Sequence, residues 1–373
     1  MLAIAFWLAS LAWLVGSTGC AMLQPRRRRF VESSFERAPV TAIVPTSTVD
    51  SSRSAEDRVE TLSSLLQVDY PEFEILVCAD RVDGSASVLD AVDALFGDKG
   101  VRTAAAPEAV SPNAKIDAME IGLGLATNDL ILFCDDDVSV DPQHLAHLVF
   151  QLRGSTRLVS AAAIGVRPAN LWGHLECSFM NGQFARLHLA GDFMGFSGAL
   201  GKTVLIHRAE VRRIGGLLPA GIDCCEDAAL TRIIKKAGGS VVLSDLPVRQ
   251  PIRQQSLPDV LRRHRRWLSC RRKYLPLLFI AEGLFCPAVT AVAAALVAAD
   301  VAGRPVWGIA ATLTLWCLVD CLFAASHRYL ALASPLAWLI REAVFVPLWL
   351  SALFARTVVW YGRRVPVSAR SAN

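Results

Sequence analysis

The chain of 373 residues is long enough for one sizeable catalytic domain together with membrane segments. Hydrophobic residues make up 53% of it, more than in ordinary globular proteins, which indicates attachment to a membrane. The net charge of +4 is modest and the basic residues lie beside apolar segments, which argues against a nucleic-acid partner and favours a phospholipid surface or a diphosphate.

The N-terminal stretch of residues 2–23 has no charged side chain and is long enough to cross a hydrocarbon core of roughly 30 Å as a helix. Basic residues 26–29 follow directly, so the positive-inside rule places the middle of the chain in the cytosol. A cleaved signal peptide or a lipoprotein Cys20 is the alternative, but no basic region precedes the apolar run. We therefore expect an anchor over residues 1–25 in a bacterial inner membrane. The ten cysteines show no C-x-x-C pair, so we expect them to be reduced thiols.

Residues 38–257 alternate between strand and helix patterns, which predicts an α/β domain with a mostly parallel sheet and flanking helices. The expected strands are 40–45, 74–78 and 130–134, and the expected helices are 55–66, 88–95 and 116–125. In open sheets of this kind ligands bind outside the carboxyl ends of the strands. Asp80 and Asp135 each follow a strand, so they point to one site.

Three carboxylates, Asp135, Asp136 and Asp137, follow the apolar strand 130–134. Alternate residues at a strand end point the same way, so Asp135 and Asp137 can share Mg²⁺ or Mn²⁺ with diphosphate oxygens. The alternative is a solvated acidic turn with Asp141 as the N-cap of the next helix. The apolar strand in front favours the metal site.

Two further signals are ambiguous from the residues alone. Glu226 and Asp227 open an expected helix over 228–236, where acids can stabilise the helix dipole or supply a general base. The amphipathic stretch 258–274 carries Arg266 and Trp267 and reads as an interfacial helix. Its arginine could also grip a diphosphate through the planar guanidinium.

Three apolar stretches follow at residues 275–299, 306–325 and 330–354, and the first two are good spanning candidates. The third carries Arg341 and Glu342, a pair that is costly in lipid unless it is buried or the segment is interfacial or re-entrant. Residues 275–360 are thus expected to form a membrane region, and 361–373 a tail.

In order and spacing, these motifs resemble those of the family 2 and family 21 glycosyltransferases, above all the ceramide glucosyltransferases. That pattern has an early Asp, a metal-binding D-x-D, a later E-D and (Q/R)-x-x-R-W. Here the corresponding residues are Asp80, Asp135 to Asp137, Glu226 with Asp227, and Arg263 to Trp267. The likeness extends over residues 112–117, 195–216 and 337–364. It implies a GT-A fold and an inverting, single-displacement reaction.

The resemblance also implies residue roles. Asp80 contacts the nucleotide, with Asp83 as the competing early aspartate. Asp135 and Asp137 hold the metal and diphosphate, and Asp227 is the base. The remaining donor- and acceptor-binding residues are Lys115, Glu226, Arg263, Arg266 and Trp267.

The resemblance implies a UDP-sugar donor, with glucose preferred, and a ceramide-like lipid acceptor; diacylglycerol, a hopanoid or a polyprenyl phosphate stay open. A processive polysaccharide synthase is the nearest alternative, but it has more membrane helices and usually Gln at the position of Arg263. A non-catalytic membrane scaffold would have no need of all the acidic positions.

Overall fold

The computed structural model describes residues 1–27, 37–46, 55–80, 85–106, 110–222, 225–326, 335–360 and 363–367. The chain forms two compact units. The helical unit comprises Met1–Gln24, Ile164–Phe196 and Ile252–Ala355, and the sheet unit comprises Pro25–Ala163, Ser197–Pro251 and Arg356–Asn373. The division differs from the expected boundaries, because residues 164–196 belong to the helical unit and not to the α/β domain.

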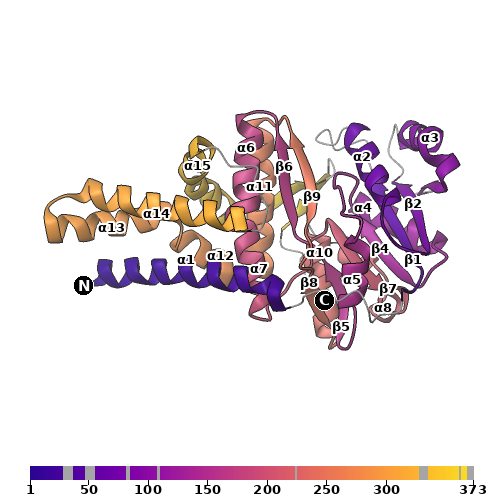
Figure 1. Cartoon of the computed structure of the whole chain (residues 1–373), viewed down its shortest axis with the longest axis horizontal. Helices are drawn as coiled ribbons and strands as arrows, with labels where there is room; N and C mark the ends of the chain where they lie inside the picture. Colours follow the sequence, from indigo (N-terminus) through magenta and orange to yellow (C-terminus); the bar gives the residue numbers. More distant parts are fainter. Residues whose placement is uncertain are drawn as a thin grey trace. The chain divides into compact units, whose positions relative to one another are not determined.

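A seven-stranded sheet forms the core of the sheet unit (Figure 1). Its strands are, in spatial order, β3 (Val101–Ala105), β2 (Phe73–Ala79), β1 (Val40–Thr46), β4 (Leu130–Cys134), β7 (Thr203–His207), β5 (Thr156–Ser160) and β8 (Ser240–Leu243). The first four run parallel, whereas β7 lies antiparallel to both β4 and β5. The predicted mostly parallel α/β sheet is confirmed, with one reversed strand that the sequence pattern did not indicate.

The central strands β1 and β4 are buried along their whole length. Strands covered on both faces carry continuous apolar runs, which is the pattern seen at residues 40–45 and 130–134. The helices of this unit are α2 (Ala55–Leu66), α3 (Ser85–Phe96), η1 (Gly97–Lys99), α4 (Ala114–Leu125), α5 (His144–Gln151), α8 (Arg208–Arg213), α9 (Leu218–Gly221) and α10 (Glu226–Lys236). A hairpin of β10 (Thr357–Trp360) and β11 (Arg363–Pro366) completes it.

The helical unit consists of α1 (Leu2–Arg27), α6 (Leu171–Ser178), η2 (Phe179–Phe184), α7 (Ala185–Phe193), α11 (Leu257–Tyr274), α12 (Pro276–Leu284), α13 (Pro287–Ala302), α14 (Pro305–Ser326) and α15 (Pro335–Leu353). The chain passes between the units through β6 (Ala163–Pro168) and β9 (Val248–Arg253), which form a separate two-stranded sheet. One segment of the helical unit, η2, is a turn of π-helix.

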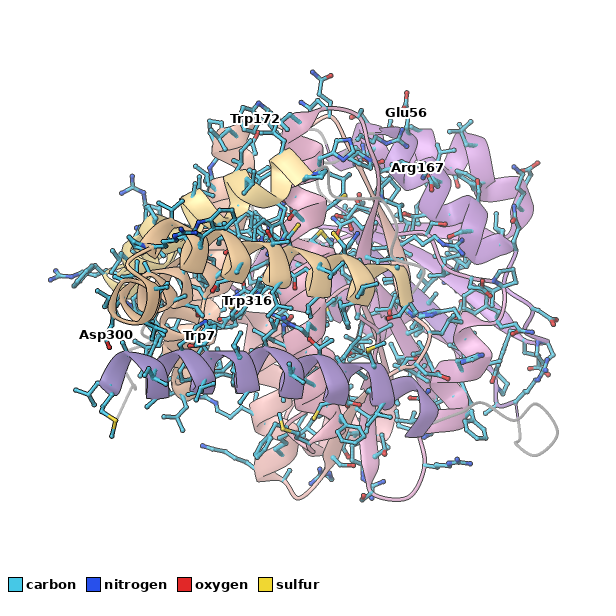
Figure 2. The ribbon with its side chains drawn as sticks, turned by 60° about the vertical axis from the view of Figure 1, so that its left-hand side comes forward. Trp7, Glu56, Arg167, Trp172, Asp300 and Trp316 are labelled. Atoms are coloured by element: carbon cyan, nitrogen blue, oxygen red, sulfur yellow. The ribbon has the colours of Figure 1, made fainter. Side chains whose placement is uncertain are left out.

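Helices α1 and α14 lie side by side and point the same way (Figures 1 and 2). The Trp7 indole donates to the Thr312 hydroxyl near the start of both helices, and Ala21 packs with Phe323 near their ends. Helix α13 precedes α14 across a turn at Gly303, whose φ of +64° suits glycine. These contacts fix the relative direction of the apolar helices.

In the part of the chain that the structure describes, three helices could cross a membrane by length and composition: α1, α14 and α15. The pair α12 and α13 adds a fourth if it counts as one span, although it bends by 44°. The sequence predicted residues 275–299 as a single spanning helix, and the bend between α12 and α13 differs from that prediction. Its physical basis is local, because Pro287 at the start of α13 interrupts the helix after Cys286.

The charged side chains Asp320 of α14 and Arg341 and Glu342 of α15 are paired and buried. Arg341 of α15 is 1% exposed, and its guanidinium donates to Asp320 at 2.6 Å, to Glu342 at 2.6 Å and to the Ser178 carbonyl at 2.8 Å. The Trp338 indole donates to the same Asp320 carboxylate. The structure therefore satisfies the first of the two conditions set for this pair, namely burial.

The cysteines only partly match the expectation of reduced thiols. Seven described cysteines are free, whereas Cys225 and Cys270 are each disulfide-bonded. The spacing of the cysteines in the sequence did not reveal these two disulfide-bonded residues, because disulfide partners need not be close in sequence.

Candidate active site

Three neighbouring parallel strands, β2, β1 and β4, end at the same edge of the sheet. Asp80 follows β2 and Asp135 follows β4, at the edge where the sequence predicted them, and Thr46 ends β1 between them. Asp80 is 1% exposed. The alternative early aspartate, Asp83, lies outside the described residues, so the choice between the two stays a prediction.

The acidic loop after β4 is fixed by separate partners for each carboxylate. Asp136 is 1% exposed, accepts a hydrogen bond from the Thr46 hydroxyl at 2.6 Å and faces Arg58 at 3.8 Å. Asp137 faces Lys202, whose ammonium is 2.7 Å from both carboxylate oxygens. Alternation along the chain thus turns Asp136 away from its neighbours, as the metal hypothesis requires.

Lys115 is the buried cation of the site. It lies in the first turn of α4, which is capped by the Asn113 side chain accepting from the Lys115 amide. Its ammonium is 4% exposed and lies 2.7 Å from Asp135, 3.0 Å from Glu226 and 3.0 Å from the Gly201 carbonyl. A buried ammonium with three oxygen partners is fully satisfied, and Lys115 joins the D-x-D loop to the E-D motif.

Asp227 lies beside this cluster at the start of α10. Its carboxylate accepts a hydrogen bond from the Gly201 amide at 3.0 Å. Burial, and then the charge of Glu226, raise the pKa of Asp227 to about 6. Burial alone would also raise the pKa of Glu226, but the Lys115 ammonium outweighs it and lowers that pKa. Adjacent carboxyls with pKa values pushed apart are typical of acid–base sites.

The dipeptide Gly201–Lys202, just before β7, was not singled out from the sequence. The Gly201 carbonyl and amide contact Lys115 and Asp227, and the Lys202 carbonyl accepts from the Asp135 amide at 2.9 Å. The contacts are mostly to backbone atoms, which carry no residue signature. The only signal in the sequence for this dipeptide was Lys202 itself, a single lysine directly before the apolar run of β7.

A divalent metal fits Asp135 and Asp137. One Asp135 oxygen lies 3.4 Å from the Lys202 ammonium that Asp137 binds, so both carboxylates converge on one cation. Among the described residues no three His, Cys, Asp or Glu side chains form a metal cluster. Two carboxylates suffice for Mg²⁺ or Mn²⁺ when substrate phosphates supply the other ligands.

The R-x-x-R-W motif lies on α11 of the helical unit. Arg263 pairs at 2.9 Å with Glu176, which is fully buried and also contacts His264. Burial alone would raise the pKa of Glu176, but Arg263 and His264 outweigh it and lower that pKa to about 2. Trp267 stacks on Phe184 at 4.9 Å. Donor binding by Arg263, Arg266 and Trp267 stays a prediction, since the aspartates belong to the other unit.

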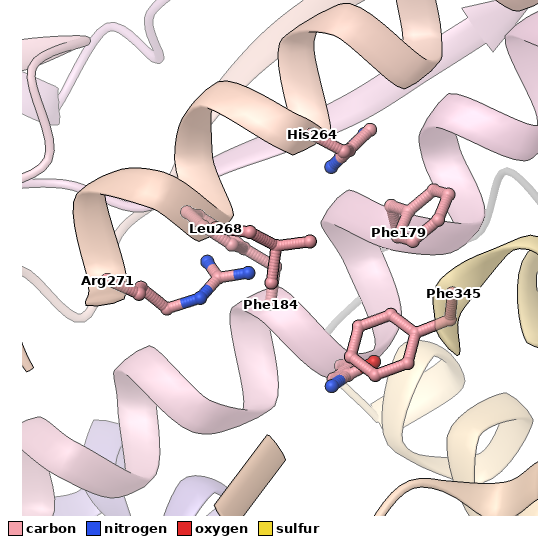
Figure 3. A pocket seen from close by; sticks show the side chains of 7 residues that line it. Phe179, Phe184, His264, Leu268, Arg271 and Phe345 are labelled. Atoms are coloured by element: carbon pink, nitrogen blue, oxygen red, sulfur yellow. The ribbon is translucent and has the colours of Figure 1, made fainter. Parts of the chain in front are cut away.

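A cavity of about 10 Å³ lies beside this motif (Figure 3). Its apolar lining is Phe179, Phe184, Leu268 and Phe345, and its polar lining is Gln183, His264 and Arg271. A volume of this size holds about one water molecule. A lipid acceptor does not fit inside it.

The sequence model of glycosyl transferase family 21 matches residues 5–372. Ceramide glucosyltransferases 1 and 3 of Caenorhabditis elegans are 21% and 22% identical over 318 and 310 residues, covering 83% and 81% of this chain and 68% of each relative. A solved mannosyltransferase from Pyrobaculum calidifontis, in complex with GDP-Man and Mn²⁺, gives a TM-score of 0.50 at 19% identity over 93% of this chain and 99% of that one. At 19% identity the solved structure supports an inference about the fold alone. The predicted GT-A fold is confirmed.

Proposed function

The chain belongs to glycosyl transferase family 21, and we propose that it moves a sugar from a UDP-sugar to the hydroxyl group of a membrane lipid. The observation that carries this proposal is the placing of Asp227 in one hydrogen-bonded cluster with Asp135 and Lys115. The names of the two nematode relatives support glucose as the sugar and a ceramide-like lipid as the acceptor. We propose a bacterial inner-membrane location, with the sheet unit in the cytosol.

The proposed reaction is a single displacement. The bond between the acceptor oxygen and the anomeric carbon forms as the bond from that carbon to the diphosphate breaks, and Asp227 takes the proton of the acceptor hydroxyl. Its ionised form is the base, and the Gly201 amide orients it. Lys115 holds Glu226 and Asp135 in place, and its charge lowers the pKa of Glu226.

Asp135 and Asp137 would hold Mg²⁺ or Mn²⁺, and the Mn²⁺ named for the mannosyltransferase supports this assignment. When bound, the metal supplies positive charge to the leaving diphosphate. Asp80, at the end of β2, is the proposed nucleotide contact. The membrane helices would keep the apolar acceptor beside the catalytic unit.

The test is transfer from labelled UDP-sugars to lipid acceptors by membranes that contain the protein, with Mg²⁺ or Mn²⁺ and with EDTA. Asp227→Asn keeps an oxygen for the Gly201 amide but removes the base, so we expect a loss of about 100-fold or more. Asp98→Asn, an exposed site in the same unit, is the matched control and should leave activity unchanged. Full activity in Asp227→Asn would exclude it as the base, and a labelled polymer would indicate a processive synthase.

A further inference from the structure

The two lysines of the site differ in how firmly they are held. Lys115 is 4% exposed and bound by two carboxylates and a carbonyl. Lys202 is 18% exposed, and its ammonium contacts the carboxylates of Asp137 and Asp135. One lysine is therefore a fixed part of the cluster, whereas the other has a flexible stem that reaches solvent.

The Lys202 ammonium occupies the point on which the carboxylates of Asp135 and Asp137 converge. It lies 2.7 Å from both oxygens of Asp137 and 3.4 Å from one oxygen of Asp135. Gln250 donates to Asp137 at 2.9 Å, so that carboxylate is oriented independently of Lys202. A metal bridging Asp135 and Asp137 and the ammonium cannot occupy the same point.

We propose that Lys202 is the exchangeable counter-cation of this site: it balances Asp135 and Asp137 until metal and donor arrive, and then moves its charge to the donor diphosphate. The inference rests on the proposed function, because it assumes that these carboxylates bind the metal. Its physical basis is charge balance. Like charges a few ångströms apart repel strongly in a partly buried site, so a cation must remain at all stages.

The exchange makes metal binding depend on the donor. Without diphosphate, a metal must break a charge-assisted pair and leave the ammonium without an anion. With diphosphate, the displaced lysine gains phosphate oxygens, which are good partners for an ammonium group. The unliganded protein should therefore bind Mn²⁺ weakly, and UDP should strengthen that binding.

The test measures Mn²⁺ affinity of the detergent-solubilised full chain, by the electron paramagnetic resonance signal of free Mn²⁺, with and without UDP. In Lys202→Met we expect Mn²⁺ without UDP to bind about tenfold more tightly than in the wild type, or about 1.4 kcal/mol. UDP should strengthen Mn²⁺ binding less in Lys202→Met than in the wild type. Lys202→Gln should behave in the same way if the methionine variant folds poorly. Lys236→Met, an exposed site on α10, controls for loss of one positive charge.

Asp137→Asn separates the two hypotheses. If it weakens Mn²⁺ binding while both Lys202 variants bind Mn²⁺ as the wild type does, the metal site stands and the exchange is wrong. If neither Asp137→Asn nor the Lys202 variants change Mn²⁺ binding, the proposed metal role fails as well. Tighter Mn²⁺ binding in the Lys202 variants, lost on adding Asp137→Asn, supports the exchange.

Discussion

At the scale of single residues, the site is organised by a backbone peptide as much as by its charged side chains. Gly201 contacts Lys115 and Asp227, and a Cβ added there would lie 3.2 Å from the Lys115 ammonium and 3.4 Å from the Asp227 carboxylate. A side chain at this position would need the Lys115 ammonium to shift by a few tenths of an ångström and would touch the Asp227 carboxylate. The acidic residues could be found from the sequence because their types are unusual after an apolar strand, whereas Gly201 could not, because its role depends on tertiary contacts.

The raised pKa of Asp227 predicts the pH profile of the reaction. The base must be ionised, so kcat/KM should fall about tenfold per pH unit as pH drops below about 6, and level off above it. Removing the neighbouring negative charge with Glu226→Gln favours the ionised form of Asp227, so the acid limb should move to lower pH. A kcat/KM profile at saturating metal measures both, and an acid limb that stays in place in Glu226→Gln would contradict the electrostatic cause.

At the scale of elements, η2 is shaped around the buried guanidinium of Arg341. Gly182 has φ −96° and ψ −106°, outside the helical range, and a Cβ there would meet the Arg341 Nη1 atom at 2.6 Å. Turns of π-helix are rare and often occur where a helix must make room for another group. Here that group is a charge held by Asp320 and Glu342.

Gly182→Ala should therefore destabilise the helical unit. The methyl group must displace a guanidinium that is buried and paired, which costs about 1–3 kcal/mol by analogy with overpacked cores. Gly191→Ala is the matched control, since its Cβ would meet its nearest neighbour, the Phe196 carbonyl, at an ordinary 3.7 Å. Thermal unfolding in detergent should show a lower Tm for Gly182→Ala alone; equal Tm values would mean that the arginine relaxes without cost.

Secondary structure was predictable where burial is continuous. Strands β1, β2 and β4 and helix α10 fall within a few residues of their predicted bounds, because apolar runs and helix periodicity are local signals. The antiparallel direction of β7 was not predictable, because an apolar run indicates a buried strand but not the direction in which that strand runs in the sheet. Assigning residues 164–196 to the helical unit was equally out of reach, since it depends on packing against segments far away in sequence.

At the scale of the whole molecule, the helix directions limit how the chain can thread a membrane. Since α1 and α14 run parallel, both lead from the same side, and α12–α13 must return to that side. Residues 25–163 and 356–373 belong to one compact unit and so lie on one side. We therefore expect an even number of crossings after α11, with the pair α12–α13 and helix α14 crossing and α15 entering and leaving on one side.

A protease-sensitive tag can test this threading. We expect a tag between Arg304 and Pro305 to be cleaved by protease added to intact spheroplasts, and a tag within residues 327–334 to be cleaved only after lysis. The positive-inside rule, with basic residues 26–29 retained in the cytosol, sets the direction. The reverse pattern would overturn this threading, because α14 would then run against α1 or the direction given by the positive-inside rule would be wrong.

The buried charge of Arg186 has a consequence for how the protein is made. Arg186 is 2% exposed and faces Asp320 at 3.3 Å, but ribosomes finish Asp320 on the order of ten seconds after it. During that delay the arginine lacks this partner, so we expect the helix around it to pack only after α14 has been made. Chains interrupted before α14 should therefore carry an uncompensated charge at Arg186.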